Sequence, residues 1–193
     1  TGGGAIGASA LTFTSTNPAG GARAWSAGAP LQNVNSAGLS CFSTGFCVAG
    51  TDSSVRWLSH VTDPTAMWQF IFGSAPGAGS IDSVACPSLH LCLAVPTGSG
   101  NDFVSTNPAA GSWRQTPVAT GYLACAATTL CVGTAFPGLA VWASTNPAGG
   151  RSAWHRTRIA RGPNSLREVS CPSTRFCVAV GDGGSVAVGQ VRH

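Results

Sequence analysis

Charged residues and long apolar runs are both scarce in this sequence. Only 8% of its 193 residues are charged, whereas a typical soluble domain has about 25%. Apolar residues make up 44% of the chain, yet no run approaches the roughly 18 consecutive apolar residues that a membrane-spanning helix needs. The sequence therefore predicts no membrane span.

Helix-forming stretches are also nearly absent. Instead, 26 glycines and 12 prolines interrupt short segments of small and β-branched residues. That pattern is typical of many short strands joined by tight turns. We therefore expect one all-β domain that covers residues 1–193, because this length suits a single domain with a sizeable core.

Lysine is absent, so arginine alone carries the positive side-chain charge in a chain of net charge +4. The arginines are spread along the sequence apart from one cluster between positions 151 and 167. This cluster is short, and no nucleic-acid recognition motif accompanies it. We expect no nucleic-acid partner and interpret the cluster as a solvated outer strand and loop.

The eight cysteines form four pairs with identical spacing. The pairs are Cys41 with Cys47, Cys86 with Cys92, Cys125 with Cys131, and Cys171 with Cys177. Zinc ribbons usually place roughly two to four residues between ligands, which is closer than here, so we predict one local disulfide per pair. Disulfides persist in oxidising compartments, so the protein is expected to be secreted or extracellular. With no signal peptide at its start, the sequence is expected to be the mature form.

An internal repeat runs through the whole chain. The phrase Ser-Thr-Asn-Pro occurs at 15–18, 105–108 and 144–147, and a degenerate copy, Thr-Asp-Pro, lies at 62–64. A tryptophan follows each copy, and these tryptophans alternate with the cysteine pairs. The tryptophans are Trp25, Trp68, Trp113 and Trp154. This alternation predicts four units, approximately 32–72, 73–118, 119–160 and 161–193, the last one completed by residues 10–31.

Each unit is predicted to contain four antiparallel strands, with the cysteine pair on facing positions across the first hairpin. Four-stranded repeats of about 40–45 residues are typical of β-propeller blades. We therefore predict a small β-propeller of four blades, closed by N- and C-terminal strands, in which the Trp25 strand completes the last blade. Residues 11–15 and 186–190 both look like third strands, so a ring of five blades is the alternative.

The phrase Ser-Thr-Asn-Pro-Ala-Gly-Gly followed by tryptophan resembles the Asp-box, Ser-x-Asp-x-Gly-x-Thr-Trp, of sialidase-type propellers, with Asn in place of Asp. The matching positions are Ser15, Asn17, Gly20 and Trp25, then Ser105, Asn107, Gly111 and Trp113, then Ser144, Asn146, Gly149 and Trp154. The resemblance implies a structural hairpin between the third and fourth strands, at the rim away from the active site. It implies the fold and no activity.

Catalytic residues are sparse. Sialidase-like hydrolysis would need an arginine triad and a tyrosine–glutamate pair, but Tyr122 and Glu168, the only residues of their types, lie in different repeats. No Gly-x-Ser-x-Gly motif is present, paired cysteines leave no thiol nucleophile, and the four histidines occupy non-equivalent repeat positions. We assign no catalytic residue, metal or cofactor, and an enzyme (a polysaccharide hydrolase or lyase) is the least favoured function.

Polar residues in predicted loops suggest a binding face instead. Propellers bind ligands where the loops between second and third strands and the loops between blades converge. The candidate ligand-binding residues in these loops are Asp52, Asp102, Asp182, Asn33, Tyr122, Asn164 and Arg167. The aspartates fit a cation site, contacts to sugar hydroxyls, or simple capping of backbone amides. Aromatic residues on the third strands, such as Trp57 and Phe103, are interpreted as packing between blades.

The favoured function is an extracellular, non-catalytic recognition module that binds carbohydrate, as a lectin does. Equivalent loops on a repeat protein provide several sites and hence avidity. The alternative is a propeller that docks on other proteins or assists their assembly. The expected partner is therefore a glycan or an extracellular protein, and the protein is expected to be a monomer.

Overall fold

The computed structural model describes residues 9–10, 12–32, 38–42, 45–52, 54–63, 65–73, 80–97, 101–135, 137–161 and 164–190. These residues form strands and four 3-10 helices of three residues each: η1 (Ala22–Ala24), η2 (Pro108–Ala110), η3 (Arg151–Ala153) and η4 (Asp182–Gly184). No helix in these ranges has the length and apolar character to cross a membrane. The all-β prediction is confirmed.

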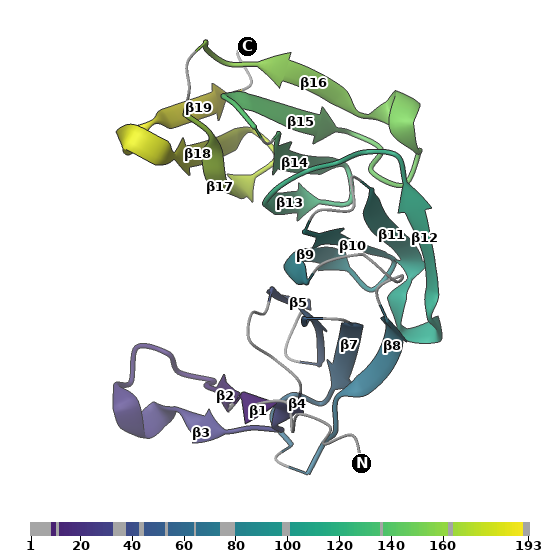
Figure 1. Cartoon of the computed structure of the whole chain (residues 1–193). Helices are drawn as coiled ribbons and strands as arrows, with labels where there is room; N and C mark the ends of the chain where they lie inside the picture. The colour runs from purple at the N-terminus through teal and green to yellow at the C-terminus, as the bar shows by residue number, and fades with distance from the viewer. Residues whose placement is uncertain are drawn as a thin grey trace, which may run out of the picture.

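Four antiparallel sheets follow one another along the chain as the blades of a β-propeller (Figure 1). The first blade contains β5 (Leu39–Phe42), β6 (Phe46–Gly50), β7 (Ser54–Ser59) and β8 (Gln69–Gly73). The second contains β9 (Ile81–Ser88), β10 (Leu91–Pro96), β11 (Asp102–Asn107) and β12 (Ser112–Thr116). The third contains β13 (Leu123–Ala127), β14 (Leu130–Thr134), β15 (Ala140–Ser144) and β16 (His155–Arg158). The fourth contains β17 (Leu166–Ser173), β18 (Phe176–Gly181) and β19 (Val186–Gln190).

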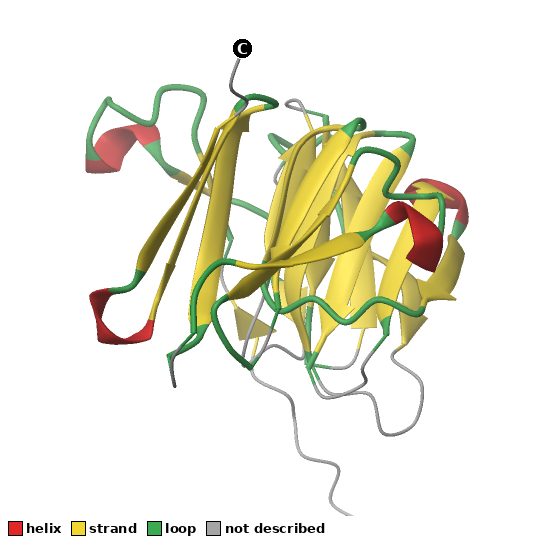
Figure 2. Ribbon diagram, turned by 90° about the horizontal axis from the view of Figure 1, so that it is seen from above, coloured by secondary structure: helices red, strands yellow, loops and turns green. Residues whose placement is uncertain are grey.

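Within each blade, consecutive strands are hydrogen-bonded neighbours, so every blade is a simple meander. Figure 2 shows the sheets from above, standing beside one another with turns and 3-10 helices at their ends. The predicted architecture, an all-β propeller of four blades, is confirmed.

The N-terminal residues form two short sheets of their own. β1 (Ser9–Ala10) pairs with β4 (Leu31–Gln32), and β2 (Phe13–Thr14) pairs with β3 (Ser26–Ala27). The expected pairing of the Trp25 strand with the last blade is therefore not formed among the described strands. The pairing is not formed because β3 is hydrogen-bonded to its own hairpin partner, β2. In the last blade, β19 already occupies the third-strand position next to β18. In Figure 1 this hairpin and the last blade lie at opposite ends of the arc of blades.

All eight cysteines form the four predicted local disulfides, each across a first hairpin. The bonds join Cys41 to Cys47, Cys86 to Cys92, Cys125 to Cys131, and Cys171 to Cys177. The Cα atoms of the bonded residues are 4.0 or 4.1 Å apart in every blade. Five intervening residues therefore suffice to bring two strand positions together around a tight turn.

The prediction that the bonded cysteines face one another holds for two of the four registers. Cys41 lies directly opposite Cys47, and Cys125 lies opposite Cys131. In the second blade the β9–β10 register shifts between Leu91 and Leu93, so Cys92 has no regular partner there. In the last blade the β17–β18 register likewise shifts across Cys171, so Cys177 has no regular partner on β17.

A bulge beside the first cysteine occurs in three of the four blades. β9, β13 and β17 each continue two residues past their first cysteine, and the register shifts at that place. β5 continues only one residue past Cys41 and pairs with β6 without a shift. The three blades with the extra residue therefore reach their turn through a bulge.

The apolar core lies between the blades. One buried cluster joins Val48 and Val55 of the first blade to Ile81 of the second, and each fully buried side chain of this size contributes about 1.5–3 kcal/mol. The blades approach so closely that a side chain at Gly50 would collide with Ile81. A second cluster joins the second and third blades around Leu93. Stability thus depends on contacts between repeats as well as within them.

The third-strand aromatics serve this packing, as predicted for Trp57 and Phe103. Trp57 stacks on Phe46 with ring centroids 5.7 Å apart, and Phe103 is buried within the cluster between the first two blades. On the third blade, the Arg151 guanidinium lies 4.3 Å from the centre of the Trp142 ring. Each of these three rings therefore contacts other protein groups.

The repeated Ser-Thr-Asn-Pro phrase builds the same turn each time. The backbone N–H of the asparagine donates to the hydroxyl of the serine two residues earlier, at 3.1 Å in every copy. The three pairs are Asn17 with Ser15, Asn107 with Ser105, and Asn146 with Ser144. This is a self-contained serine turn, so the phrase is explained by local structure.

Candidate functional site

A cavity opens at one end of the strands that come first in their blades. It has a volume of about 480 Å³ and is lined by the start of β9, the loop between β10 and β11, the segment before β13 and the start of β17. The opposite ends of β5, β9, β13 and β17, where the disulfides lie, line a separate cavity of about 410 Å³. We call the first cavity the loop-end pocket.

Three candidate residues from the sequence line the loop-end pocket: Asp102, Tyr122 and Arg167. Asp182 adjoins them through its ion pair with Arg167. Because these residues come from three different blades, only the tertiary fold brings them together. Whether they bind a ligand stays a prediction.

Asp102 begins β11 and is only 1% exposed. Both of its carboxylate oxygens accept a hydrogen bond from the backbone N–H of Thr120, at 3.1 and 3.2 Å. Burial raises the pKa of Asp102 to about 7, although the Thr120 side chain and the Thr120 backbone N–H both act in the opposite direction. The pocket wall therefore contains a carboxyl group that changes its charge near neutral pH.

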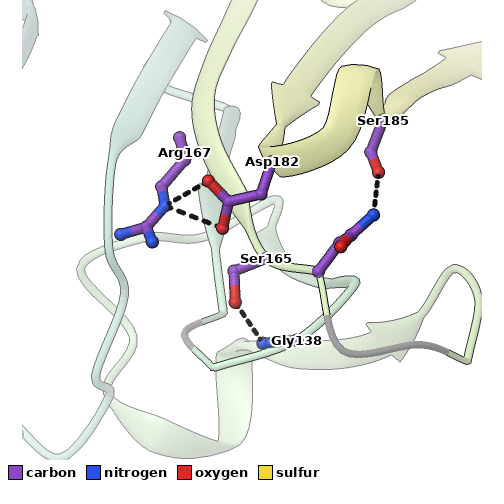
Figure 3. Close-up of polar contacts among 6 residues, drawn as sticks. Gly138, Ser165, Arg167, Asp182 and Ser185 are labelled. Atoms are coloured by element: carbon purple, nitrogen blue, oxygen red, sulfur yellow. Dashed lines mark hydrogen bonds and ion pairs between the residues drawn. The ribbon is translucent and has the colours of Figure 1, made fainter.

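Arg167 on β17 and Asp182 at the start of η4 form an exposed ion pair within the last blade. The Arg167 Nε donates to both carboxylate oxygens of Asp182, at 3.0 and 3.2 Å, and Figure 3 shows the two side chains pointing toward one another. The hydrogen bond from Arg167 lowers the pKa of Asp182 below its ordinary value. Asp182 is therefore ionised at neutral pH and offsets the charge of Arg167.

The remaining predicted residues lie elsewhere. Asp52 is half-buried in the turn between β6 and β7 and does not line the pocket. The Asn164 amide donates to the Ser185 hydroxyl at 3.3 Å, which ties the loop before β17 to the turn after η4. Asn33 lies outside the described residues. The aspartates of equivalent loops therefore have different surroundings and do not form one ring.

Sequence reasoning did not select Asp82 and Thr120, which also line the loop-end pocket. Asp82 accepts a hydrogen bond from the Ser80 hydroxyl at 2.5 Å. Thr120 is 9% exposed, and its hydroxyl oxygen is buried without a hydrogen-bond partner in the described part of the protein. Asp82 alternates with buried Ile81 and Ser83, a period-two signal that could have placed its side chain on the opposite face of the strand from theirs.

The described residues contain no group of three or more His, Cys, Asp or Glu side chains placed to hold a metal ion. The pocket is lined by carboxylates, hydroxyls, one phenol and one guanidinium beside apolar side chains. Such a set can orient a ligand by hydrogen bonds and charge.

No protein-family model and no curated protein matches the sequence. The Asp-box resemblance therefore rests on the repeated phrase alone.

Solved structures do match the fold, and they include β-propellers. YCF48 from Cyanidioschyzon merolae is 14% identical with a TM-score of 0.62, over 93% of this chain and 63% of that one. A structure of YCF48 bound to D1 peptide is 14% identical with a TM-score of 0.64, over 88% and 55%. Kluyveromyces lactis Hsv2p is 12% identical with a TM-score of 0.59, over 85% and 52%.

A computationally designed protein, Ika4, is 13% identical with a TM-score of 0.56, over 78% of this chain and 88% of the design. The chain thus spans about half to two thirds of the three natural structures. At these identities the likeness defines the class, a β-propeller, and nothing more specific.

Proposed function

We propose that this propeller is a non-catalytic recognition module that binds a segment of another protein in the loop-end pocket. One observation carries the proposal: a single cavity at the propeller's loop end combines an apolar wall with a few polar groups held in fixed positions. That combination is typical of specific binding sites. The pocket belongs to no single repeat, so it favours one ligand over several equivalent weak sites.

The lining suits a polypeptide. Val95, Pro96 and Leu166 supply apolar surface, while Asp102 and Arg167 supply an acceptor and a donor. A polypeptide presents apolar side chains and backbone N–H and C=O groups at short intervals, so it can use both kinds of surface. One similar propeller has been solved with a bound peptide, which supports this ligand class by analogy of fold alone.

Carbohydrate binding is the second candidate. Tyr122 and the carboxylates of Asp82 and Asp102 line the same pocket, and an aromatic ring beside carboxylates suits a sugar. The third-strand aromatics do not strengthen this candidate, because Trp57 and Phe103 are used in packing. The pocket would then hold one glycan instead of one per blade.

An extracellular location supports either ligand. The four disulfides fit an oxidising compartment. We therefore propose that the protein acts outside the cytoplasm, where both protein and glycan partners are available.

Two parallel binding screens test the proposal. A displayed library of random dodecapeptides and a glycan array would each be probed with the wild-type protein, Tyr122→Ala, Arg167→Ala and the control Arg175→Ala. Arg175 lies in the exposed turn at the disulfide end of the last blade. We expect selected peptides that bind wild type and Arg175→Ala but lose about tenfold or more in affinity with the two pocket variants.

Other results would change the conclusion. Glycan binding that is lost in Tyr122→Ala, with no peptide selected, would favour a lectin. Peptides that bind all four proteins equally would place recognition outside the pocket. Turnover of a polysaccharide that disappears in Asp102→Asn would show an enzyme and would contradict the non-catalytic role.

A further inference from the structure

We propose that the loop-end pocket accepts a cationic side chain, lysine or arginine, of the bound segment and holds its charge against Asp102 and Asp82. This inference rests on the proposed function and specifies its ligand. It follows from the charges, the burial and the unused hydrogen-bonding capacity of the pocket.

The pocket is acidic although the chain carries a net charge of +4. Asp82 and Asp102 both line it, and Arg167 is the only cationic side chain among its described lining residues. Arg167 is already paired with Asp182 at 3.0 Å. The ion pair leaves the two pocket carboxylates without a compensating charge, and the low-dielectric wall strengthens their field.

The unused hydrogen-bond acceptors of the pocket wall also favour a cationic ligand. Asp102 is 1% exposed and its described hydrogen-bond donor is the backbone N–H of Thr120, which leaves lone pairs on both oxygens. The Thr120 side chain lies close enough to lower the pKa of Asp102, yet its buried hydroxyl oxygen has no hydrogen-bond partner at ordinary distance in the described residues. An ammonium or guanidinium group carries only donors, so it matches a wall that offers a carboxylate and a hydroxyl oxygen.

The ionisation of Asp102 gives this geometry a signature in pH. Burial raises its pKa to about 7, and a ligand cation would favour the ionised form. The other groups around the pocket are Asp82 on β9, Tyr122 before β13, and Arg167 with Asp182 on the last blade. Of these, Asp182 has a lowered pKa and stays ionised. Comparison with the Asp102→Asn variant assigns a loss of binding on mild acidification to Asp102.

The test uses two small probes that differ by the terminal ammonium group: N-acetyl-lysine methylamide and its neutral analogue N-acetyl-norleucine methylamide. Each is titrated into the whole protein at about pH 8 and about pH 5.5, on either side of the carboxyl transition. Backbone amide NMR shifts report binding. We expect the lysine probe, and not the norleucine probe, to shift the Thr120 and Gly121 signals at the higher pH. Its affinity should fall several-fold at the lower pH.

Asp102→Asn keeps the shape and an acceptor for Thr120 while it removes the charge, and it should weaken the lysine probe about tenfold or more. Asp82→Asn provides a second variant if the first does not fold, and Asp52→Asn, outside the pocket, is the matched control that should change nothing. Equal shifts by both probes, or none by either, would overturn the inference.

The outcomes separate this inference from the proposed function. If displayed peptides bind through the pocket but the lysine probe does not, recognition stands and the cationic ligand is wrong. If the lysine probe binds in the pocket and no peptide is selected, the pocket takes a cation but the protein-binding function fails.

Discussion

The N-terminal hairpin and the outer hairpin of the third blade have almost the same sequence but different surroundings. Residues 15–25 and 144–154 differ at two of eleven positions. In both, the glycine before the 3-10 helix has a positive φ, 73° at Gly21 and 78° at Gly150, with an extended ψ that glycine alone adopts readily. Yet Trp25 is 46% exposed, whereas Trp154 is 2% exposed.

The neighbouring blade makes this difference. Trp154 packs with Leu93 and Val104 of the second blade, and its Nε1 donates to the Pro147 carbonyl at 3.3 Å. No described blade precedes the hairpin of Trp25. Nearly identical local sequences therefore build the same turn, whereas the contribution of each tryptophan to stability depends on which neighbouring blade it packs against.

The aspartates of equivalent loops show the same contrast. Asp102, in the second blade, is buried and has a raised pKa, whereas Asp182, in the last blade, is exposed, paired with Arg167 and has a lowered pKa. The second blade thus encloses a loop aspartate whose equivalent in the last blade is in contact with water.

The largest expected effect separates the two tryptophans. Trp154→Ala should lower the free energy of unfolding by about 3–5 kcal/mol, because it leaves a cavity between two blades. Trp25→Ala should change it by less than about 1 kcal/mol, as for most exposed positions. Chemical denaturation of both variants measures this. Equal losses would mean that the N-terminal hairpin is packed as tightly as the third blade.

A second effect, of up to about 4 kcal/mol, separates the two aspartates. The ordinary pKa of Asp102 is 3.8 and its folded value is about 7. Between these values the folded state holds a proton that the unfolded state lacks, so stability should fall as pH rises toward about 7. Unfolding curves at several pH values measure the slope.

The matched variants sharpen this test. Asp102→Asn should remove its part of the slope. Asp182→Asn should leave the slope between about pH 5 and pH 8 unchanged, because a lowered pKa places the loss of its ion pair below the ordinary range. A slope that survives in Asp102→Asn would show that another group causes it.

The smallest effect concerns these two glycines of positive φ. Gly150→Ala should cost about 1–3 kcal/mol, because a Cβ disfavours positive φ with extended ψ. Gly21→Ala carries the same local strain, but we expect it to appear as faster amide exchange at residues 22–25 with little change in global unfolding. Hydrogen exchange with denaturation distinguishes the two. A global loss from Gly21→Ala as large as that from Gly150→Ala would couple the N-terminal hairpin to the blades.

The sequence alone determined the disulfide pairs and the serine turns, because both depend on the spacing between nearby residues. The disulfides join residues six positions apart, and the serine turns span two residues, so their partners are chosen before any blade packs. Spacing did not determine the register around Cys92 and Cys177, where a shift replaces the regular pairing found at Cys47 and Cys131. Four copies of such units predicted the four blades, because a hairpin with one apolar face has to stack on another.

Only the tertiary structure decided how the ends and the pocket are arranged. The sequence did not predict that β3 stays with β2, because strand pairing between remote segments depends on which edge another strand already occupies. Likewise, Asp102 lines the pocket with Arg167 while Asp52 lies outside it, although Asp52 and Asp102 were both chosen as aspartates in loops between second and third strands. The burial, charge and pKa of these residues depend on the blades that pack beside them. Because the repeats are similar in sequence, the sequence alone does not show which neighbour each repeat will have.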